Sequence, residues 1–164
     1  NAIAKGYIAD RVKVFLTDRG VEHALIDLGR NILLIGGKPD GSDFRIGVQD
    51  PFDPEEASAR YVLKAAGKSV VTSGVYERYF EYEGVRYHHI LDPFTGFPAD
   101  RGVVSATIVS DDSAQGDALS TTCLLLGPEA GLAVIESVPG VEALLIGADG
   151  QEWFSSGFKA YLAD

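Results

Sequence analysis

The chain has 164 residues, of which 46% are hydrophobic, and its 14 lysines and arginines are outnumbered by 24 acidic residues, giving a net charge of −10. The length is typical of one domain, and the apolar content is enough for an ordinary core. The acidic balance argues against general nucleic-acid binding, which needs a basic face. No apolar run approaches the roughly 20 residues that span a bilayer, and the single cysteine, Cys123, cannot form an internal disulfide.

The first half of the chain is predicted to contain one amphipathic helix followed by short strands. Apolar residues recur at helical spacing from Ile3 to Leu16, Asp10 falls among the polar residues of the opposite face, and Gly20 ends the helix. Runs rich in β-branched and aromatic residues, bounded by turn residues, then indicate strands. The expected strands are His23–Leu28, Ile32–Ile35, Phe44–Val48, Tyr61–Ala65 and Ser69–Thr72.

The second half is predicted to begin with a hairpin and to continue with a central strand and two helices. Asp111, Asp112 and Ser113 supply N-cap chemistry for the first of these helices, which runs to Leu126 before Gly127. The expected elements are strands Val75–Tyr82 and Val85–Ile90, strand Val103–Ser110, a helix to Leu126, a helix Pro128–Ser137, and strands Val141–Ile146 and Glu152–Ser155. Antiparallel strand hairpins with about three helices indicate an α+β fold, and residues 1–164 are expected to form a single domain.

Two segments have the composition of phosphate-binding sites. Ala2–Tyr7 lies at a helix start, where free amides and the cation of Lys5 suit an anion, although such helix starts are also common without a ligand. In the second segment, Thr72, Ser73 and Gly74 end a strand, and Gly74 lets the backbone approach a ligand closely. Arg78 can bind a phosphate, or it can pair with a neighbouring glutamate.

The run from Tyr87 to Pro98 contains two adjacent histidines. His88 and His89 point to opposite faces of a strand and cannot easily share a metal, so one of them is expected to face a site while the other packs or faces solvent. Asp92 and Pro93, followed by Thr95 and Gly96, build a tight turn.

Asp117 and Thr121 are four residues apart, which places both side chains on one face of a helix. Oxygen ligands in such small number suit Mg²⁺, which keeps bound waters and takes part of its shell from substrate phosphates. Thr121 can alternatively bond back to a helix carbonyl, and Asp117 can pair with a lysine.

The four segments, in this order and spacing, resemble the ApbE family of FAD:protein FMN transferases, once described as thiamine-biosynthesis lipoproteins. The matching stretches are Ala2–Tyr7, Thr72–Arg78, His89–Pro98 and Asp117–Thr121. The resemblance implies a fold like that of ApbE and T-fold proteins and an exported or membrane-anchored bacterial enzyme, periplasmic or extracytoplasmic. It also implies a protein about twice this long, of which the present chain is the C-terminal portion.

The resemblance implies that FAD and Mg²⁺ are bound, and that FMN is transferred to a threonine or serine hydroxyl of an acceptor protein with release of AMP. By position, the metal ligands fall on Asp117, Thr121 and the backbone carbonyl of Ala2. Lys5 falls at a flavin-contacting position, and His89 opens the stretch that lies against the cofactor.

In the expected mechanism a hydroxyl attacks the FMN-side phosphorus in line. His89 is the candidate base or phosphate-orienting group, and Asp117 is the alternative base. The alternative functions are hydrolysis of FAD to FMN and AMP, non-catalytic flavin binding, and an interaction module in which all four motifs are structural.

Overall fold

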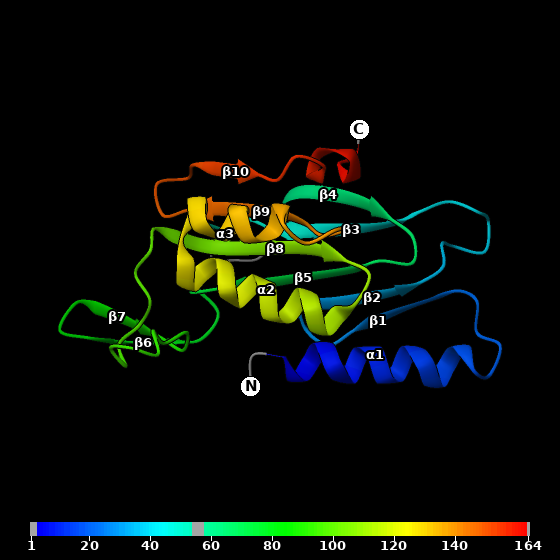
Figure 1. Ribbon diagram of the computed structural model, residues 1–164, viewed down its shortest axis with the longest axis horizontal. Helices are drawn as coiled ribbons and strands as arrows, with labels where there is room; N and C mark the ends of the chain where they lie inside the picture. The colour runs from blue at the N-terminus through cyan, green and yellow to red at the C-terminus, as the bar shows by residue number, and fades with distance from the viewer. Residues whose placement is uncertain (1–2, 54–57, 164) are drawn as a thin grey trace.

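The computed structural model describes residues 3–53 and 58–163. Its centre is a fully antiparallel six-stranded sheet with the strand order β1-β2-β5-β8-β9-β10 (Figure 1). The strands are β1 (Ala24–Asp27), β2 (Asn31–Ile35), β5 (Ser69–Gly74), β8 (Val103–Ser110), β9 (Glu142–Gly147) and β10 (Glu152–Phe154). The chain is therefore α+β, as predicted.

Two helices, α2 (Ser113–Leu126) and α3 (Pro128–Glu136), cover one face of the sheet (Figure 1). The core beneath them is apolar and includes Ile108 of β8, Leu145 of β9 and Leu124 of α2, all buried. Cys123 belongs to this core, and burial raises the pKa of its thiol to about 11. This cysteine therefore acts as a small apolar residue.

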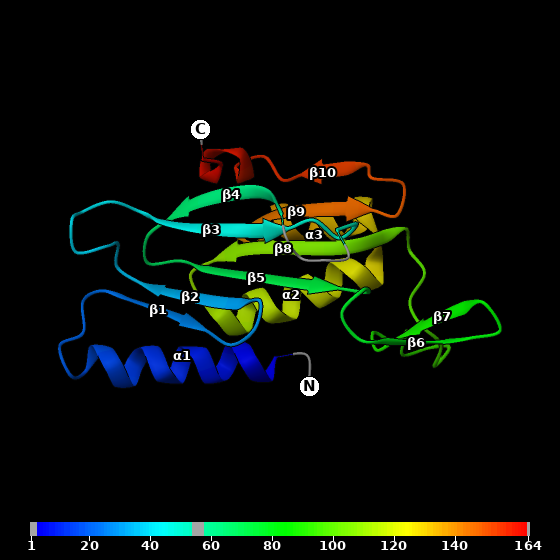
Figure 2. The same ribbon diagram turned by 180° about the vertical axis from the view of Figure 1, so that it is seen from behind.

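The opposite face is covered by the hairpin β3 (Phe44–Gln49) and β4 (Ala59–Ala65) and by a short 3-10 helix, η1 (Phe158–Tyr161) (Figure 2). Period-two alternation sends Leu144 and Ile146 of β9 to this side, where they pack with Phe158. The 3-10 helix was not predicted, and β3 pairs with β4 in a separate two-stranded sheet.

Helix α1 (Ala4–Thr17) lies at the β1 end of the sheet, where it packs against β2 and α2. The predicted packing face of this helix was wrong. Its buried residues are Gly6 and Ala9, whereas Tyr7 and Phe15 are 59% and 53% exposed. The small residues allow a close approach that the large side chains would prevent, so the helix packs through its small-residue face.

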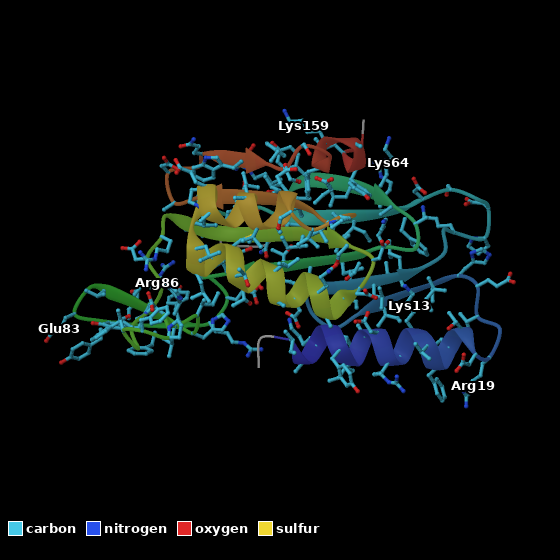
Figure 3. All side chains as sticks on the ribbon, in the orientation of Figure 1. Lys13, Arg19, Lys64, Glu83, Arg86 and Lys159 are labelled. Carbon is cyan, nitrogen blue, oxygen red and sulfur yellow. The ribbon has the colours of Figure 1, made fainter. Side chains whose placement is uncertain are left out.

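The predicted hairpin around Glu83 and Gly84 is confirmed, as β6 (Tyr79–Tyr82) paired with β7 (Val85–His88). The first strand is shorter than expected, because residues 75–78 form a turn. The hairpin extends away from the body of the molecule, and Figure 3 shows Glu83 and Arg86 on this projection.

The predicted N-cap of α2 is right in position, but the side chain that caps the helix was not predicted. Asp112 occupies the N-cap position, but its side chain makes no capping hydrogen bond. Instead Asp10 of α1 caps α2: its two carboxylate oxygens accept hydrogen bonds from the backbone N–H groups of Ser113 at 2.8 Å and Ala114 at 2.9 Å. A residue assigned to the polar outer face of α1 thus fixes the start of another helix.

Candidate functional site

A cleft of about 510 Å³ opens where β5 ends, between α1, α2 and the segments that flank the β6–β7 hairpin. Every predicted site residue within the described part of the chain lines this cleft. These residues are Lys5, Thr72, Ser73, Gly74, Arg78, His89, Asp117 and Thr121. Ala2, the remaining predicted residue, lies outside the described residues.

The carboxylate of Asp117 is held at the junction of the two helices. Asp117 is only 6% exposed, and its Oδ2 accepts a 2.9 Å hydrogen bond from the backbone N–H of Gly6, in the first turn of α1. Among residues 3–53 and 58–163, Asp117 forms no ion pair with a lysine. Within the described residues, its Oδ1 makes no hydrogen bond.

Thr121 lies one turn beyond Asp117 on the same side of α2, and its hydroxyl donates to the Asp117 carbonyl at a long 3.3 Å. A hydroxyl oxygen accepts through its lone pairs while it donates its proton, so this bond does not prevent Thr121 from binding a cation. The two side chains offer hard oxygen ligands from one helix face.

The donor set fits Mg²⁺ bound in part by a ligand. The described residues contain no group of three or more histidine, cysteine, aspartate or glutamate side chains that would hold a metal by themselves. Mg²⁺ commonly takes one or two carboxylates, waters and substrate phosphates. The free oxygen of Asp117 and the hydroxyl of Thr121 match this mode of binding rather than a closed protein cage.

Lys5 and the end of β5 line the cleft. The Lys5 ammonium donates to the carbonyl of Gly29 at 2.8 Å, which fixes the side chain between α1 and the β1–β2 turn. The hydroxyl of Ser73 is 2.8 Å from that of Ser120 in α2, and the hydroxyl of Thr72 is 2.8 Å from that of Thr107 in β8. These bonds anchor the strand end against its neighbours.

In and after the turn that follows β5, two glutamates form ion pairs with arginines other than Arg78. Glu77 forms an ion pair with Arg30 at 3.4 Å, and Glu81 pairs with Arg86 at 3.4 Å. Neither glutamate pairs with Arg78, which is exposed and makes no side-chain ion pair or hydrogen bond within residues 3–53 and 58–163. The guanidinium is thus available to an anion. Glu77 also lines the cleft and was not predicted.

The two histidines line different clefts. His88 lies in a second cleft of about 400 Å³ that contains none of the predicted site residues. Its Nε2 donates to the carbonyl of Ala99 at 3.1 Å, and its Nδ1 accepts from the N–H of Ile90 at 3.3 Å. Burial lowers the pKa of His88. Both ring nitrogens are therefore engaged, as expected of a structural neutral imidazole.

His89 has one ring nitrogen available. Its Nδ1 lies 3.2 Å from the carbonyl oxygen of Arg78, and a carbonyl can only accept, so this nitrogen carries the proton in the neutral ring. The Nε2 atom then keeps its lone pair. This tautomer suits a proton acceptor in the 510 Å³ cleft.

The turn that follows closes one side of the cleft. Asp92 anchors it: the side-chain Oδ1 accepts from the N–H of Phe94 at 2.8 Å, and the backbone carbonyl accepts from Gly96 at 2.8 Å. The hydrogen bond from the Phe94 N–H lowers the pKa of the Asp92 carboxyl group, with further contributions from the Thr95 N–H and from Arg101. Gly96, with a φ of 73°, has the left-handed backbone that the turn requires. The predicted tight turn is confirmed.

The fold is antiparallel α+β, and its cleft combines a carboxylate, hydroxyls, a free guanidinium and an imidazole. These groups are typical of a protein that binds an anionic ligand. The chain belongs to the ApbE family, whose model matches residues 1–145. It is 43% identical to a protein named FAD:protein FMN transferase from Treponema pallidum over 95% of this chain and 45% of that protein. It is 45% identical to one of the same name from Klebsiella pneumoniae, over 88% of this chain and 44% of that protein.

Solved structures agree with the family assignment. The ApbE protein of Thermotoga maritima matches 99% of this chain and 52% of its own, with a TM-score of 0.89 and 36% identity. The flavin transferase ApbE of Vibrio cholerae matches with a TM-score of 0.83 and 34% identity, over 98% of this chain and 51% of its own. The chain therefore spans about half the length of the relatives it matches.

Proposed function

We propose that this chain forms part of a Mg²⁺-dependent FAD:protein FMN transferase, which moves FMN from FAD to a threonine or serine hydroxyl of an acceptor protein and releases AMP. One observation carries the proposal. The cleft in an ApbE-family chain brings together Asp117, Thr121, Arg78 and His89 from separate segments. A molecule bound in this cleft would meet groups that bind a cation, a group that binds an anion and a proton acceptor.

The reaction balances as a substitution at phosphorus. A bond forms between the acceptor hydroxyl oxygen and the FMN-side phosphorus of FAD, and the bond from that phosphorus to the oxygen of AMP breaks. The hydroxyl proton passes to a base in the cleft, and AMP leaves with the electron pair of the broken bond. Mg²⁺, when bound, would neutralise charge on the pyrophosphate oxygens.

The residues of the chain divide these tasks. Asp117 and Thr121 would hold the cation, with the Ala2 carbonyl as a third ligand by family position. Arg78 would bind a phosphate oxygen through its free guanidinium, while Lys5 and residues 72–74, which also line the cleft, would contact the cofactor. His89, through Nε2, would accept the hydroxyl proton or orient the phosphate, and Asp117 is the alternative base.

The test is to incubate the complete natural protein with FAD, Mg²⁺ and a peptide that carries a threonine or serine. The expected result is a gain of one FMN in peptide mass together with one equivalent of AMP. Formation of FMN and AMP without modified peptide would make the protein an FAD hydrolase. Binding of FAD without any product would indicate a non-catalytic flavin-binding protein. Absence of FAD binding would favour the alternative that the chain is an interaction module whose motifs are structural.

We also propose a periplasmic or otherwise extracytoplasmic, membrane-anchored location, which rests on the family alone. No helix among the described residues is long and apolar enough to cross a membrane. The location is tested by fractionating cells that express the complete natural gene. Recovery of the protein in the cytosolic fraction alone would contradict the proposal.

A further inference from the structure

Helices α1 and α2 cap each other's N-termini reciprocally. Asp10 of α1 accepts hydrogen bonds from the N–H groups of Ser113 and Ala114, and Asp117 of α2 accepts one from the N–H of Gly6. In both helices the accepting carboxylate lies one turn beyond the capped backbone: Gly6 precedes Asp10 by four residues, and Ser113 precedes Asp117 by four. The two N-terminal turns therefore form a single interlocked unit.

The close approach of the two helices makes this unit rigid. A Cβ on Gly6 would lie 2.6 Å from the Cα and from the N of Ala114, and closer still to the carbonyl oxygen of Ser113. Backbone is therefore packed on backbone at the position where the carboxylates cross. Ser113 is also fixed from the sheet side, because its hydroxyl donates to the side-chain oxygen of Asn31 in β2. Both Ser113 and Asn31 are fully buried.

This unit determines where the free oxygen of Asp117 points. Oδ2 accepts the hydrogen bond from Gly6, which fixes the orientation of the carboxylate relative to α1. The position of Oδ1 therefore depends on how the first turn of α2 packs against α1. Among the described residues, Asp10 is the only side chain that bonds the N–H groups of Ser113 and Ala114. Removal of a residue that orients a metal ligand commonly lowers metal affinity or activity by about 10–100-fold.

We infer that Asp10 is a positioning residue for the Asp117 metal site: by capping α2 it aims the free oxygen of Asp117 into the cleft. The inference rests on the proposed function. Asp10 does not line the cleft, so it acts through Asp117 and not on the substrate. Its removal is expected to weaken the binding of the divalent cation more than the binding of FAD.

The experiment compares wild type, Asp10→Ala, Asp10→Asn and Asp18→Ala in the complete natural protein. Asp18→Ala removes the same charge from the exposed end of α1, so it controls for the change in net charge. The first readout is the dissociation constant for Mn²⁺ alone, from electron paramagnetic resonance. The second is the Mg²⁺ concentration for half-maximal AMP release, measured beside the KM for FAD.

For Asp10→Ala we expect about a tenfold or larger rise in the Mn²⁺ dissociation constant and in the Mg²⁺ half-saturation, with the KM for FAD changed less than about threefold at saturating metal. Asp10→Asn keeps one acceptor oxygen and should fall between Asp10→Ala and wild type, while Asp18→Ala should match wild type. Unchanged Mn²⁺ binding in a folded Asp10→Ala variant would overturn the inference. If Asp10→Ala does not fold, Asp10→Asn decides by the same readout.

The two proposals fail in different ways. Wild type that binds Mn²⁺ more tightly than Asp10→Ala but releases no AMP contradicts the transferase proposal and supports the positioning role. Wild type that releases AMP with the same metal dependence as Asp10→Ala supports the transferase and overturns the positioning role. Equal loss of metal binding in Asp10→Ala and Asp18→Ala would assign the effect to net charge and also overturn it.

Discussion

The side chain of Asp117 and the backbone of Gly6 are 111 residues apart in sequence and are joined by a 2.9 Å hydrogen bond at the junction of two helices. This bond leaves one carboxylate oxygen for the cleft. It also couples the cation site to the packing of α1, so substitutions on that helix are expected to alter the site without touching a ligand.

Asp117→Asn is expected to abolish Mg²⁺-dependent AMP release while the protein stays folded. The amide oxygen of asparagine can still accept from the Gly6 N–H, whereas its NH₂ group would face the cleft and cannot bind a cation. The measurement is AMP release against Mg²⁺ concentration, with a thermal melt as the check on folding. Asp112→Asn, a neutralisation at the N-cap of the same helix where the side chain makes no capping bond, should behave as wild type.

Gly6→Ala is expected to lower the free energy of unfolding by about 1–3 kcal/mol, as overpacking does in a tight contact. The reason is the backbone of Ala114, 2.6 Å from the added Cβ, which can move only if the helices separate. Gly131→Ala, where the nearest neighbour of the added Cβ is 3.2 Å away at Cys123, should cost less. Denaturant unfolding of both variants measures the difference, and equal costs would contradict the proposed close packing.

Arg78→Ala is expected to raise the KM for FAD by about tenfold, a loss of roughly 1.4 kcal/mol in binding, with kcat changed less. The guanidinium has no carboxylate partner within the described residues and is exposed at the cleft. Arg86→Ala removes a guanidinium that is paired with Glu81 outside this cleft, so its KM should match that of wild type. Equal KM values for the two variants would contradict a role of the Arg78 guanidinium in binding FAD.

His89→Ala is expected to reduce kcat for FMN transfer by about 10²–10⁴-fold if His89 is the general base. Its Nε2 is the available ring nitrogen, since Nδ1 bonds the Arg78 carbonyl. Initial rates of peptide modification measure the effect. His88→Gln, which alters the neighbouring histidine of the other cleft, should retain the wild-type rate. Full transfer by His89→Ala would remove the base role of His89 and leave Asp117 as the candidate.

The stability of the protein is expected to decline when the pH falls below the ordinary histidine value of 6.5, in part because of His88. Burial lowers the pKa of His88 in the folded state, so the unfolded chain binds the proton first and is favoured as the pH drops. Above the unfolded value the imidazole is neutral in both states and contributes no pH dependence. Thermal melts between about pH 7.5 and about pH 5.5 should show a smaller decline for His88→Gln than for wild type.

The positions of most helices and strands were evident from the sequence, because they depend on local chemistry. Gly127 and Pro128 mark the boundary between α2 and α3, and Glu83 with Gly84 marks the β6–β7 turn. The site motifs could also be predicted from the sequence, because a carboxylate and a hydroxyl four residues apart share one face of a helix wherever that helix lies.

The sequence by itself therefore determined the fold class, the family and the residue types that meet in the cleft. Only the tertiary structure decided which face of α1 is buried, which carboxylate caps α2, and that Glu77 pairs with Arg30 rather than with Arg78. Each of these depends on residues distant in sequence coming into contact. A local pattern cannot reveal that Asp10, on the apparently polar face of one helix, is the cap of another.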